Sequence, residues 1–212
     1  MPKTDILLAN RSAPIQERGA QTMERVLQAA AELLQETGFE NLSTNAICER
    51  AGLTPPALYR YFPNKYAVMR ELGERLMDRQ NDALAQWAAS GLPDADVAGS
   101  IAQVLRTTLD ATRATTAGGW IMRSLHASPL LSEVRLNSHR KMTGQLAAWA
   151  SQKWPDAEPQ RVFTAMRLSI EIGYAVVEMI VDDETLDADA LIAQTAEMIA
   201  ASLARVSGHA SG

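Results

Sequence analysis

The chain has 212 residues, of which 47% are hydrophobic and 21% are charged. This length and apolar content exclude a disordered chain and suit a small unit joined to one larger domain with a sizeable core. No apolar run reaches the roughly 20 residues that span a bilayer. Asp5 interrupts a short apolar stretch near the N-terminus, so no signal peptide is predicted. We expect a cytoplasmic protein with a flexible arm over residues 1–18.

The net charge of −5 is distributed unevenly. Residues 1–70 hold eight Lys/Arg and seven Asp/Glu, whereas residues 71–212 hold twelve Lys/Arg and eighteen Asp/Glu. Affinity for phosphate depends on the local charge and not on the total, so nucleic-acid binding by the first part stays open. Its mild basicity predicts weak binding by one subunit and the need for a dimer.

Helical periodicity begins near residue 20 and is divided by glycine and proline. An amphipathic helix is predicted over 20–37, because Gly38 stands where a left-handed cap belongs. Ser43 is placed to cap a second helix, and Gly52 to supply the turn that follows it.

A third and a fourth helix are predicted next. Thr54 can cap the third helix, and Pro55 fits its first position, where the missing N–H costs nothing. Pro63 ends this helix, and Asn64 caps a long fourth helix that runs to about Ala89.

The remaining sequence is also helical in pattern, and strand signals are nearly absent. Further helices are predicted at about 97–115, from 120 to His126, from 132 to Lys153, at 160–181 and at 190–206. The sequence therefore predicts an all-α fold. We place a helix-turn-helix domain at 19–65, an effector-binding and dimerisation domain at 66–206, and a flexible tail at 207–212.

Residues 43–65 indicate DNA recognition. Leu58 and Phe62 are spaced four residues apart and should anchor the inner face of the third helix. This spacing turns Tyr59 outward, together with parts of Arg60 and Tyr61. Arginine can pair with guanine through two hydrogen bonds, and tyrosine hydroxyls can reach phosphates. Two short helices in this layout predict a helix-turn-helix, although a helical subdomain with an aromatic-rich surface has the same spacing.

Two further positions flank this surface. Thr44 and Asn45 lie in the first turn of the second helix, where they can reach a phosphate or a base edge. Lys65 stands beside the N–H groups that begin the fourth helix, and we expect it to clamp a phosphate.

The segment TMERVLQAAAELLQETGFENLSTNAICERAGLTPPALYRYFPNKYAVM resembles the N-terminal domain of TetR-family transcriptional regulators over about residues 21–72. The LYRYFPNK stretch is especially specific to that family. The resemblance implies an all-helical homodimer that binds DNA through its first three helices and a small ligand through its C-terminal domain. The positions that it implies for DNA contact are Thr44, Asn45, Pro55, Pro56, Ala57, Tyr59, Arg60, Tyr61 and Lys65.

Two positions depart from the family pattern. The Pro55–Pro56 pair removes two N–H donors at the start of the recognition helix, which reduces backbone contacts to phosphate there. Tyr66 stands where the family often has an acidic residue, so the charge at the start of the fourth helix differs.

Aromatic, methionine and histidine side chains on the central helices are the candidates for effector binding. Such groups suit an apolar ligand of variable shape, although core packing explains each one separately. We predict a mainly hydrophobic effector with few polar anchors. The candidates are Trp120, Met122, His126, Met142, Trp149, Phe163, Met166 and Tyr174.

The helices at 160–181 and 190–206 are apolar on more than one side. Two such helices from each of two subunits would form a four-helix dimer interface, although part of each face must serve the intrachain core. Arg167, Glu171 and Glu178 form a polar stripe near Tyr174. They could bind a cationic or polar ligand group, but a solvated face or ion pairs at an interface is the interpretation that we favour.

Other chemistry finds little support in the sequence. Cys48 is the single cysteine. It could sense oxidation, but we favour a packing role. His126 and His139 lack a metal-ligand pattern, so no metal or cofactor is predicted. No nucleophile–base pair or phosphate loop indicates an enzyme.

We therefore predict a ligand-responsive repressor of the TetR type. A DNA-binding architectural protein without an effector, and a helical enzyme or lipid-binding module, remain the alternatives. A fully packed C-terminal core would favour the architectural protein, and a large cavity with converging polar groups would favour the enzyme or lipid-binding module.

Overall fold

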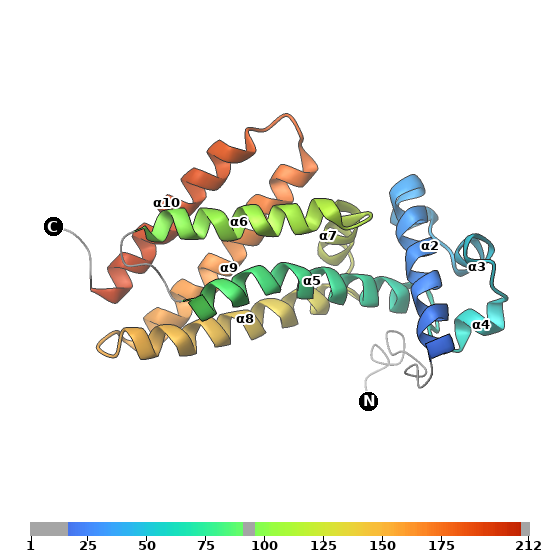
Figure 1. Ribbon diagram of the computed structural model, residues 1–212, viewed down its shortest axis with the longest axis horizontal. Helices are drawn as coiled ribbons and strands as arrows, with labels where there is room; N and C mark the ends of the chain where they lie inside the picture. Colours follow the sequence, from blue (N-terminus) through green and yellow to red (C-terminus); the bar gives the residue numbers. More distant parts are fainter. Residues whose placement is uncertain (1–16, 91–95, 209–212) are drawn as a thin grey trace. The chain divides into compact units, whose positions relative to one another are not determined.

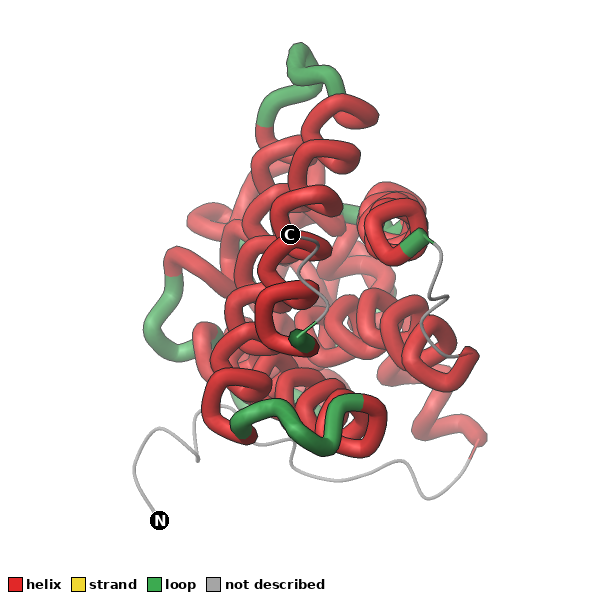
Figure 2. Tube along the Cα trace, turned by 90° about the vertical axis from the view of Figure 1, so that its left-hand side faces the viewer, coloured by secondary structure: helices red, strands yellow, loops and turns green. Residues whose placement is uncertain are grey.

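The structure is a computed structural model that describes residues 17–90 and 96–208. Within these ranges the elements are helices joined by loops and no strand occurs, as Figure 2 shows. The all-α prediction is confirmed. Most of the predicted arm at 1–18, most of the loop at 91–96 and the end of the predicted tail lie outside the described residues.

Figure 1 shows the helices in chain order. Their limits differ from the predicted ones by a few residues at most, because capping side chains, glycine and proline set most of the ends. The helices are α2 (Glu17–Asn41), α3 (Thr44–Ala51), α4 (Pro55–Tyr59), α5 (Lys65–Ser90), α6 (Val97–Ala114), α7 (Gly118–Ala127), α8 (Ser132–Lys153), α9 (Pro159–Asp182) and α10 (Ala188–Ser207). No helix in the described ranges is long and apolar enough to cross a membrane.

The chain forms two compact units. The first comprises Met1–Leu76 with Ala114–Arg135, and the second comprises Met77–Arg113 with Leu136–Gly212. Helix α5 therefore contributes its beginning to the first unit and its remainder to the second. Helix α7 joins the first unit, which the sequence pattern did not indicate, and the functional boundary at residue 65 stays a prediction.

The first unit has an apolar core between α2, α3, α4 and the start of α5. Leu58 and Phe62 are fully buried, which confirms their predicted inward positions. Val26, Leu34 and Ile47 are fully buried beside them in the same unit. These side chains fix the short helices, which are too short to be stable in isolation.

Gly38 sits at a kink near the C-terminal end of α2. Its φ of 74° confirms the predicted positive value, but its ψ of 171° is extended, and helical residues continue to Asn41. The ring of Trp120, on α7, lies 3.5 Å from the position that a Cβ on Gly38 would occupy. The kink therefore forms the surface against which α7 packs.

In the second unit, α9 and α10 lie side by side (Figure 1). Val177, Ile180, Ile192 and Ala196 are buried. Glu158 caps α9 by accepting hydrogen bonds from two backbone N–H groups, and Asp187 caps α10 in the same way with one. Much of the predicted apolar pattern on these helices therefore serves the intrachain core.

Candidate functional site

Helices α3 and α4 form the helix-turn-helix that the sequence indicates. Ser43 caps α3, since its hydroxyl accepts a hydrogen bond from the Ala46 N–H at 3.2 Å. Gly52 adopts φ 62° and ψ 41°, a left-handed conformation that favours glycine. Pro55 begins α4 after Thr54, whose carbonyl accepts the N–H of the first turn although its side chain makes no cap. Local chemistry thus sets the angle between the two helices.

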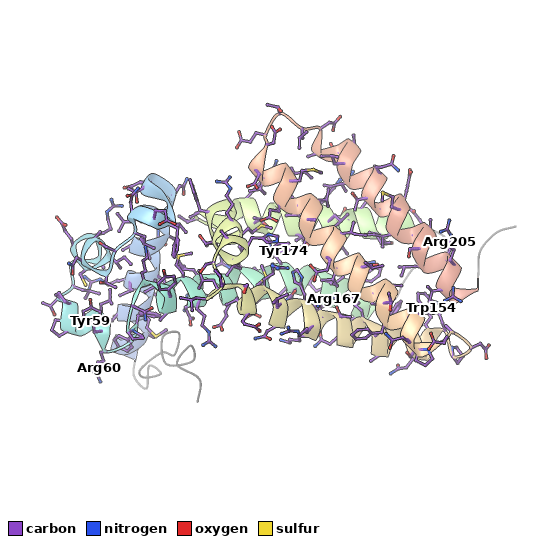
Figure 3. All side chains as sticks on the ribbon, turned by 180° about the vertical axis from the view of Figure 1, so that it is seen from behind. Tyr59, Arg60, Trp154, Arg167, Tyr174 and Arg205 are labelled. Atoms are coloured by element: carbon purple, nitrogen blue, oxygen red, sulfur yellow. The ribbon has the colours of Figure 1, made fainter. Side chains whose placement is uncertain are left out.

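Most residues that the family resemblance assigns to DNA contact lie at the surface of α3 and α4. Asn45, Pro55, Pro56 and Arg60 are exposed, whereas Thr44, Ala57, Tyr59 and Lys65 are half-buried. Figure 3 labels Tyr59 and Arg60 on this surface. The arrangement offers hydroxyl, amide and guanidinium donors from neighbouring turns.

Thr44 and Tyr59 are brought together although fifteen residues separate them. Their hydroxyl oxygens lie 3.0 Å apart and share a hydrogen bond. This bond ties the first turn of α3 to the last residue of α4, so it orients both side chains. A nucleic acid would meet a pre-positioned pair, which lowers the entropy lost on binding.

Tyr61 and Lys65 differ from the exposed positions in their surroundings. The Tyr61 side chain is 7% exposed, so its predicted outward position is wrong, because Tyr61 lies in the turn after α4 and not on the helix. The Lys65 ammonium donates to the carbonyl of Phe39 at 3.1 Å and lies 4.5 Å from the centre of the Phe39 ring. Lys65 therefore caps the C-terminal end of α2, and its predicted phosphate contact stays a prediction.

Several other cations of the first unit are engaged by carboxylates. Arg50 pairs with Glu36 at 2.7 Å, and Arg75 pairs with Glu24 at 2.7 Å. The hydrogen bond from Arg50 holds the pKa of Glu36 below its ordinary value. These ion pairs hold Arg50 and Arg75 against carboxylates of the same unit.

Cys48 lies on the inner side of α3. Its side chain is 4% exposed, and burial raises the pKa of its thiol. A protonated, buried thiol is a poor nucleophile and a slow target for oxidation. These surroundings favour the packing interpretation.

A cavity of about 110 Å³ lies in the second unit between α5, α6, α8, α9 and α10. This volume is well above the roughly 10–15 Å³ that one water needs, so a ligand group fits. The lining is mostly apolar, and among the described residues that form it there is no Asp, Glu, Lys or Arg. The lining residues are Met77, Gln80, Asn81, Leu84, Trp87, Ile101, Val104, Leu105, Thr108, His139, Leu146, Met166, Ser169, Ile170, Gly173, Tyr174, Ile199 and Leu203.

Of the predicted effector residues, Met166 and Tyr174 line this cavity. Trp149 lies behind it, with its ring 6.0 Å from that of the lining residue Trp87. Met142 is buried in the core, and Phe163 points outward with 45% of its side chain exposed.

The remaining three candidates belong to the first unit and do not line the cavity. Trp120, Met122 and His126 lie on α7, which packs against α2 through Trp120. The sequence spacing of α7 matches that of a cavity-lining helix, and only the tertiary packing separates the two cases.

The polar stripe on α9 forms ion pairs. Arg167 pairs with Glu171 one helical turn away, and Nδ1 of His139 lies 3.1 Å from the other carboxylate oxygen of Glu171. The ring of His139 meets that of Tyr174 edge-on, with the ring centres 4.8 Å apart. Figure 3 labels Arg167 and Tyr174 on α9. Arg167 and Glu171 therefore form an ion pair within α9.

Sequence reasoning missed several polar lining residues, notably Gln80, Asn81 and Thr108. Their only sequence signal is a polar residue on an otherwise apolar helix face, which also marks ordinary core hydrogen bonds. Within residues 17–90 and 96–208, no group of three or more His, Cys, Asp or Glu side chains is placed to hold a metal ion.

Comparison with known proteins identifies the helix-turn-helix. The model of the family described as bacterial regulatory proteins, tetR family, matches residues 26–72. The HTH-type transcriptional regulator UidR of Escherichia coli (strain K12) is 26% identical over 189 residues, which cover 85% of this chain and 91% of that protein.

One further similarity is confined to a quarter of the chain, and another covers the whole fold. The tetracycline repressor protein class C of Escherichia coli is 43% identical over 54 residues, and this match spans 26% of the chain and 25% of that repressor. The crystal structure of the multidrug binding protein EbrR complexed with imidazole has a TM-score of 0.65 at 16% identity, covering 91% of this chain and 97% of that one. The DNA-binding region of the chain, residues 26–72, therefore belongs to the TetR family of transcriptional regulators.

Proposed function

We propose that this protein is a homodimeric repressor that binds a near-palindromic operator and releases it when a small, mainly hydrophobic effector enters the cavity. The observation that carries the proposal is the surface of α3 and α4, where Asn45, Tyr59 and Arg60 are accessible beside the Thr44–Tyr59 hydrogen bond. Tyr59 and Arg60, at the end of α4, can read base edges in the major groove, and Asn45 on α3 can reach a phosphate or a base edge. A repressor of this kind acts on chromosomal DNA and therefore works in the cytoplasm.

Arg60 is the proposed base reader. Arg60 is exposed, and its guanidinium lies 5.8 Å from the ring centre of Tyr61. This cation–π contact with the buried tyrosine helps to orient the arginine. Asn45 and Tyr59 would add contacts to a base edge and to phosphate. The pair Pro55–Pro56 is exposed at the start of α4 and has no N–H to donate, which leaves phosphate contact there to side chains.

The proposed effector site is the cavity in the second unit. Helix α5 lines it with residues from Met77 to Trp87, and the same helix begins at Lys65, which caps α2 in the first unit. A ligand that tilts α5 would change the spacing of the two DNA-binding units in a dimer. Both half-sites must be met at once, so a small change in spacing weakens binding strongly. A fully packed second unit would have favoured the architectural alternative.

The proposed dimer forms through α9 and α10. Exposed apolar residues follow each other on α9 at spacings of four, three and four: Leu168, Ile172, Ala175 and Met179. Met198 on α10 is 57% exposed. An apolar helix face of this kind is typical of a protein interface, and it faces away from the buried side of α9.

The dimer requirement is tested by Ile172→Glu. A carboxylate inside an apolar interface costs free energy unless it is paired, so we expect monomers in analytical ultracentrifugation and a loss of operator affinity of at least about tenfold. Phe163→Glu is the matched control, since Phe163 is 45% exposed on another side of α9, and it should leave the dimer intact. Equal dimerisation of the two variants would contradict the proposed interface.

A further inference from the structure

The cavity has two chemically different ends. Helices α5 and α8 run in the same direction along it, because Asn81 donates to the Ser138 hydroxyl at 2.8 Å while Trp87 packs against Trp149. At a rise of 1.5 Å per residue, Asn81 and Trp87 lie about 9 Å apart along α5. The first position is lined by hydrogen-bonding side chains and the second by apolar ones.

The polar end consists of Asn81, His139 and Tyr174. His139 follows Ser138, the partner of Asn81, and its ring contacts that of Tyr174 at 4.8 Å. His139 and Tyr174 are 4% and 8% exposed, so a ligand group that reaches them leaves water behind. Buried polar groups of a ligand must then find hydrogen-bond partners among these side chains.

The apolar end is lined by Leu84, Trp87, Leu146 and Met166. The ring of Trp149 backs Trp87, and the ring of Trp154 lies 6.1 Å from that of Trp149. An alkyl or aromatic body would bury its surface here, at about 25 cal/mol for each Å² removed from water. Of the four tryptophans of the chain, Trp87 lines the cavity, so its fluorescence reports on this end.

Charges near the polar end are already matched. The carboxylate of Glu171 lies between the Arg167 guanidinium and Nδ1 of His139, and neither Arg167 nor Glu171 is among the residues that line the cavity. An anionic ligand head at His139 would approach the carboxylate of Glu171. A cationic head at the same place would find the carboxylate of Glu171 already paired with Arg167, and it would meet no carboxylate among the described lining residues. A buried ion without a partner costs far more than a buried neutral group.

We propose that the cavity takes an uncharged amphiphile, with a hydrogen-bonding head such as a hydroxyl against Asn81, His139 and Tyr174 and an apolar body directed toward Trp87. The assignment of this ligand class rests on the proposed function, in which the same cavity receives the effector. It narrows that function to neutral molecules that can both donate to and accept from amide, imidazole and phenol groups.

The test is a titration of the dimer, without DNA, with octanol, octanoate, octylammonium and methyl octyl ether. Tryptophan fluorescence reports binding, and calorimetry confirms it. Octanol should bind at least about tenfold more tightly than either ion. It should also bind about fivefold more tightly than the ether, which is more apolar but cannot donate. Equal or tighter binding of an ion or of the ether, or no binding by any of the four, would overturn the ligand class.

Two pairs of variants test where the polar head and the apolar body of the ligand lie. Tyr174→Phe should weaken octanol about fivefold and the ether by less, because octanol can both donate to and accept from the phenol whereas the ether can only accept. Tyr66→Phe in the first unit should change neither. Trp87→Phe should abolish most of the fluorescence response, whereas Trp120→Phe should preserve it. The orientation is wrong if Tyr174→Phe weakens both compounds equally or if Trp120→Phe removes the response.

Operator release is measured separately from ligand binding. Octanol that binds as described but leaves the operator complex intact would contradict the effector function and preserve the ligand class. Failure of all four compounds to bind would overturn the ligand class, while operator binding by the unliganded dimer would still support the DNA-binding function.

Discussion

Arg60 is the residue on which recognition of the operator's base sequence most directly depends. Its exposed guanidinium follows the last residue of α4, and a guanidinium can form two hydrogen bonds with one guanine. Arg60→Ala should cost about 1–3 kcal/mol of binding free energy, confined to operators that carry the contacted base. Fluorescence anisotropy against operators with single base changes measures this loss.

Arg60→Lys is the control for charge. Lysine keeps the positive charge but lacks the planar pair of donors, so it should restore binding to phosphate and not the base preference. A uniform loss with Arg60→Ala on all operators, fully repaired by Arg60→Lys, would make Arg60 a phosphate contact instead.

Residue positions were predictable where one interaction dominates. The spacing of Leu58 and Phe62 correctly indicated their burial, because an inward face on a short helix has few alternatives. The burial of Tyr61 was not predictable, since it depends on the turn that follows α4. Which side chains line the cavity was not predictable either, because Trp120 and Tyr174 both follow a glycine on a predicted helix but belong to different units.

At the scale of elements, the kink in α2 gives a direct test of backbone conformation. Gly38 has φ 74° and ψ 171°, a region essentially confined to glycine. Gly38→Ala should lower the free energy of unfolding by about 1–3 kcal/mol. Chemical denaturation followed by circular dichroism gives this value.

Gly144 provides a control in which the same substitution should raise the free energy of unfolding. It lies inside α8, is exposed, and has no atom within 4 Å of the position that a Cβ would occupy. Gly144→Ala should stabilise the protein by about 0.5–1 kcal/mol, because alanine favours the helix. Similar effects of the two substitutions would contradict the assigned conformation of Gly38.

The helices themselves were well predicted because their ends carry local signals. Ser43, Gly52 and Asn64 act at the predicted positions through a cap, a left-handed turn and a second cap. The assignment of α7 to the first unit was not predictable, since it follows from packing of Trp120 against the kink at Gly38 and of Leu125 against Gly73. Those contacts join residues far apart in the chain.

For the whole molecule, the distribution of charge predicts a modest dependence of operator binding on salt. Among the described cations of the first unit, Arg50, Arg70 and Arg75 pair with carboxylates, and Arg60 and Lys65 are the cations that we propose to contact DNA. With two cations from each of two subunits, the slope of log K against log salt should be about −4. Operator titrations at several salt concentrations measure this slope. A slope near zero, or one of about −10, would contradict the proposed contacts.

The central claim is that a dimer reads DNA sequence through the surfaces of α3 and α4. The most direct measurement is selection of bound duplexes from a random DNA pool with the full chain. The account predicts an inverted repeat whose half-sites are centred roughly 34–36 Å apart, or a multiple of that spacing. Recovery of no common sequence, or of a single unrepeated half-site, would contradict it.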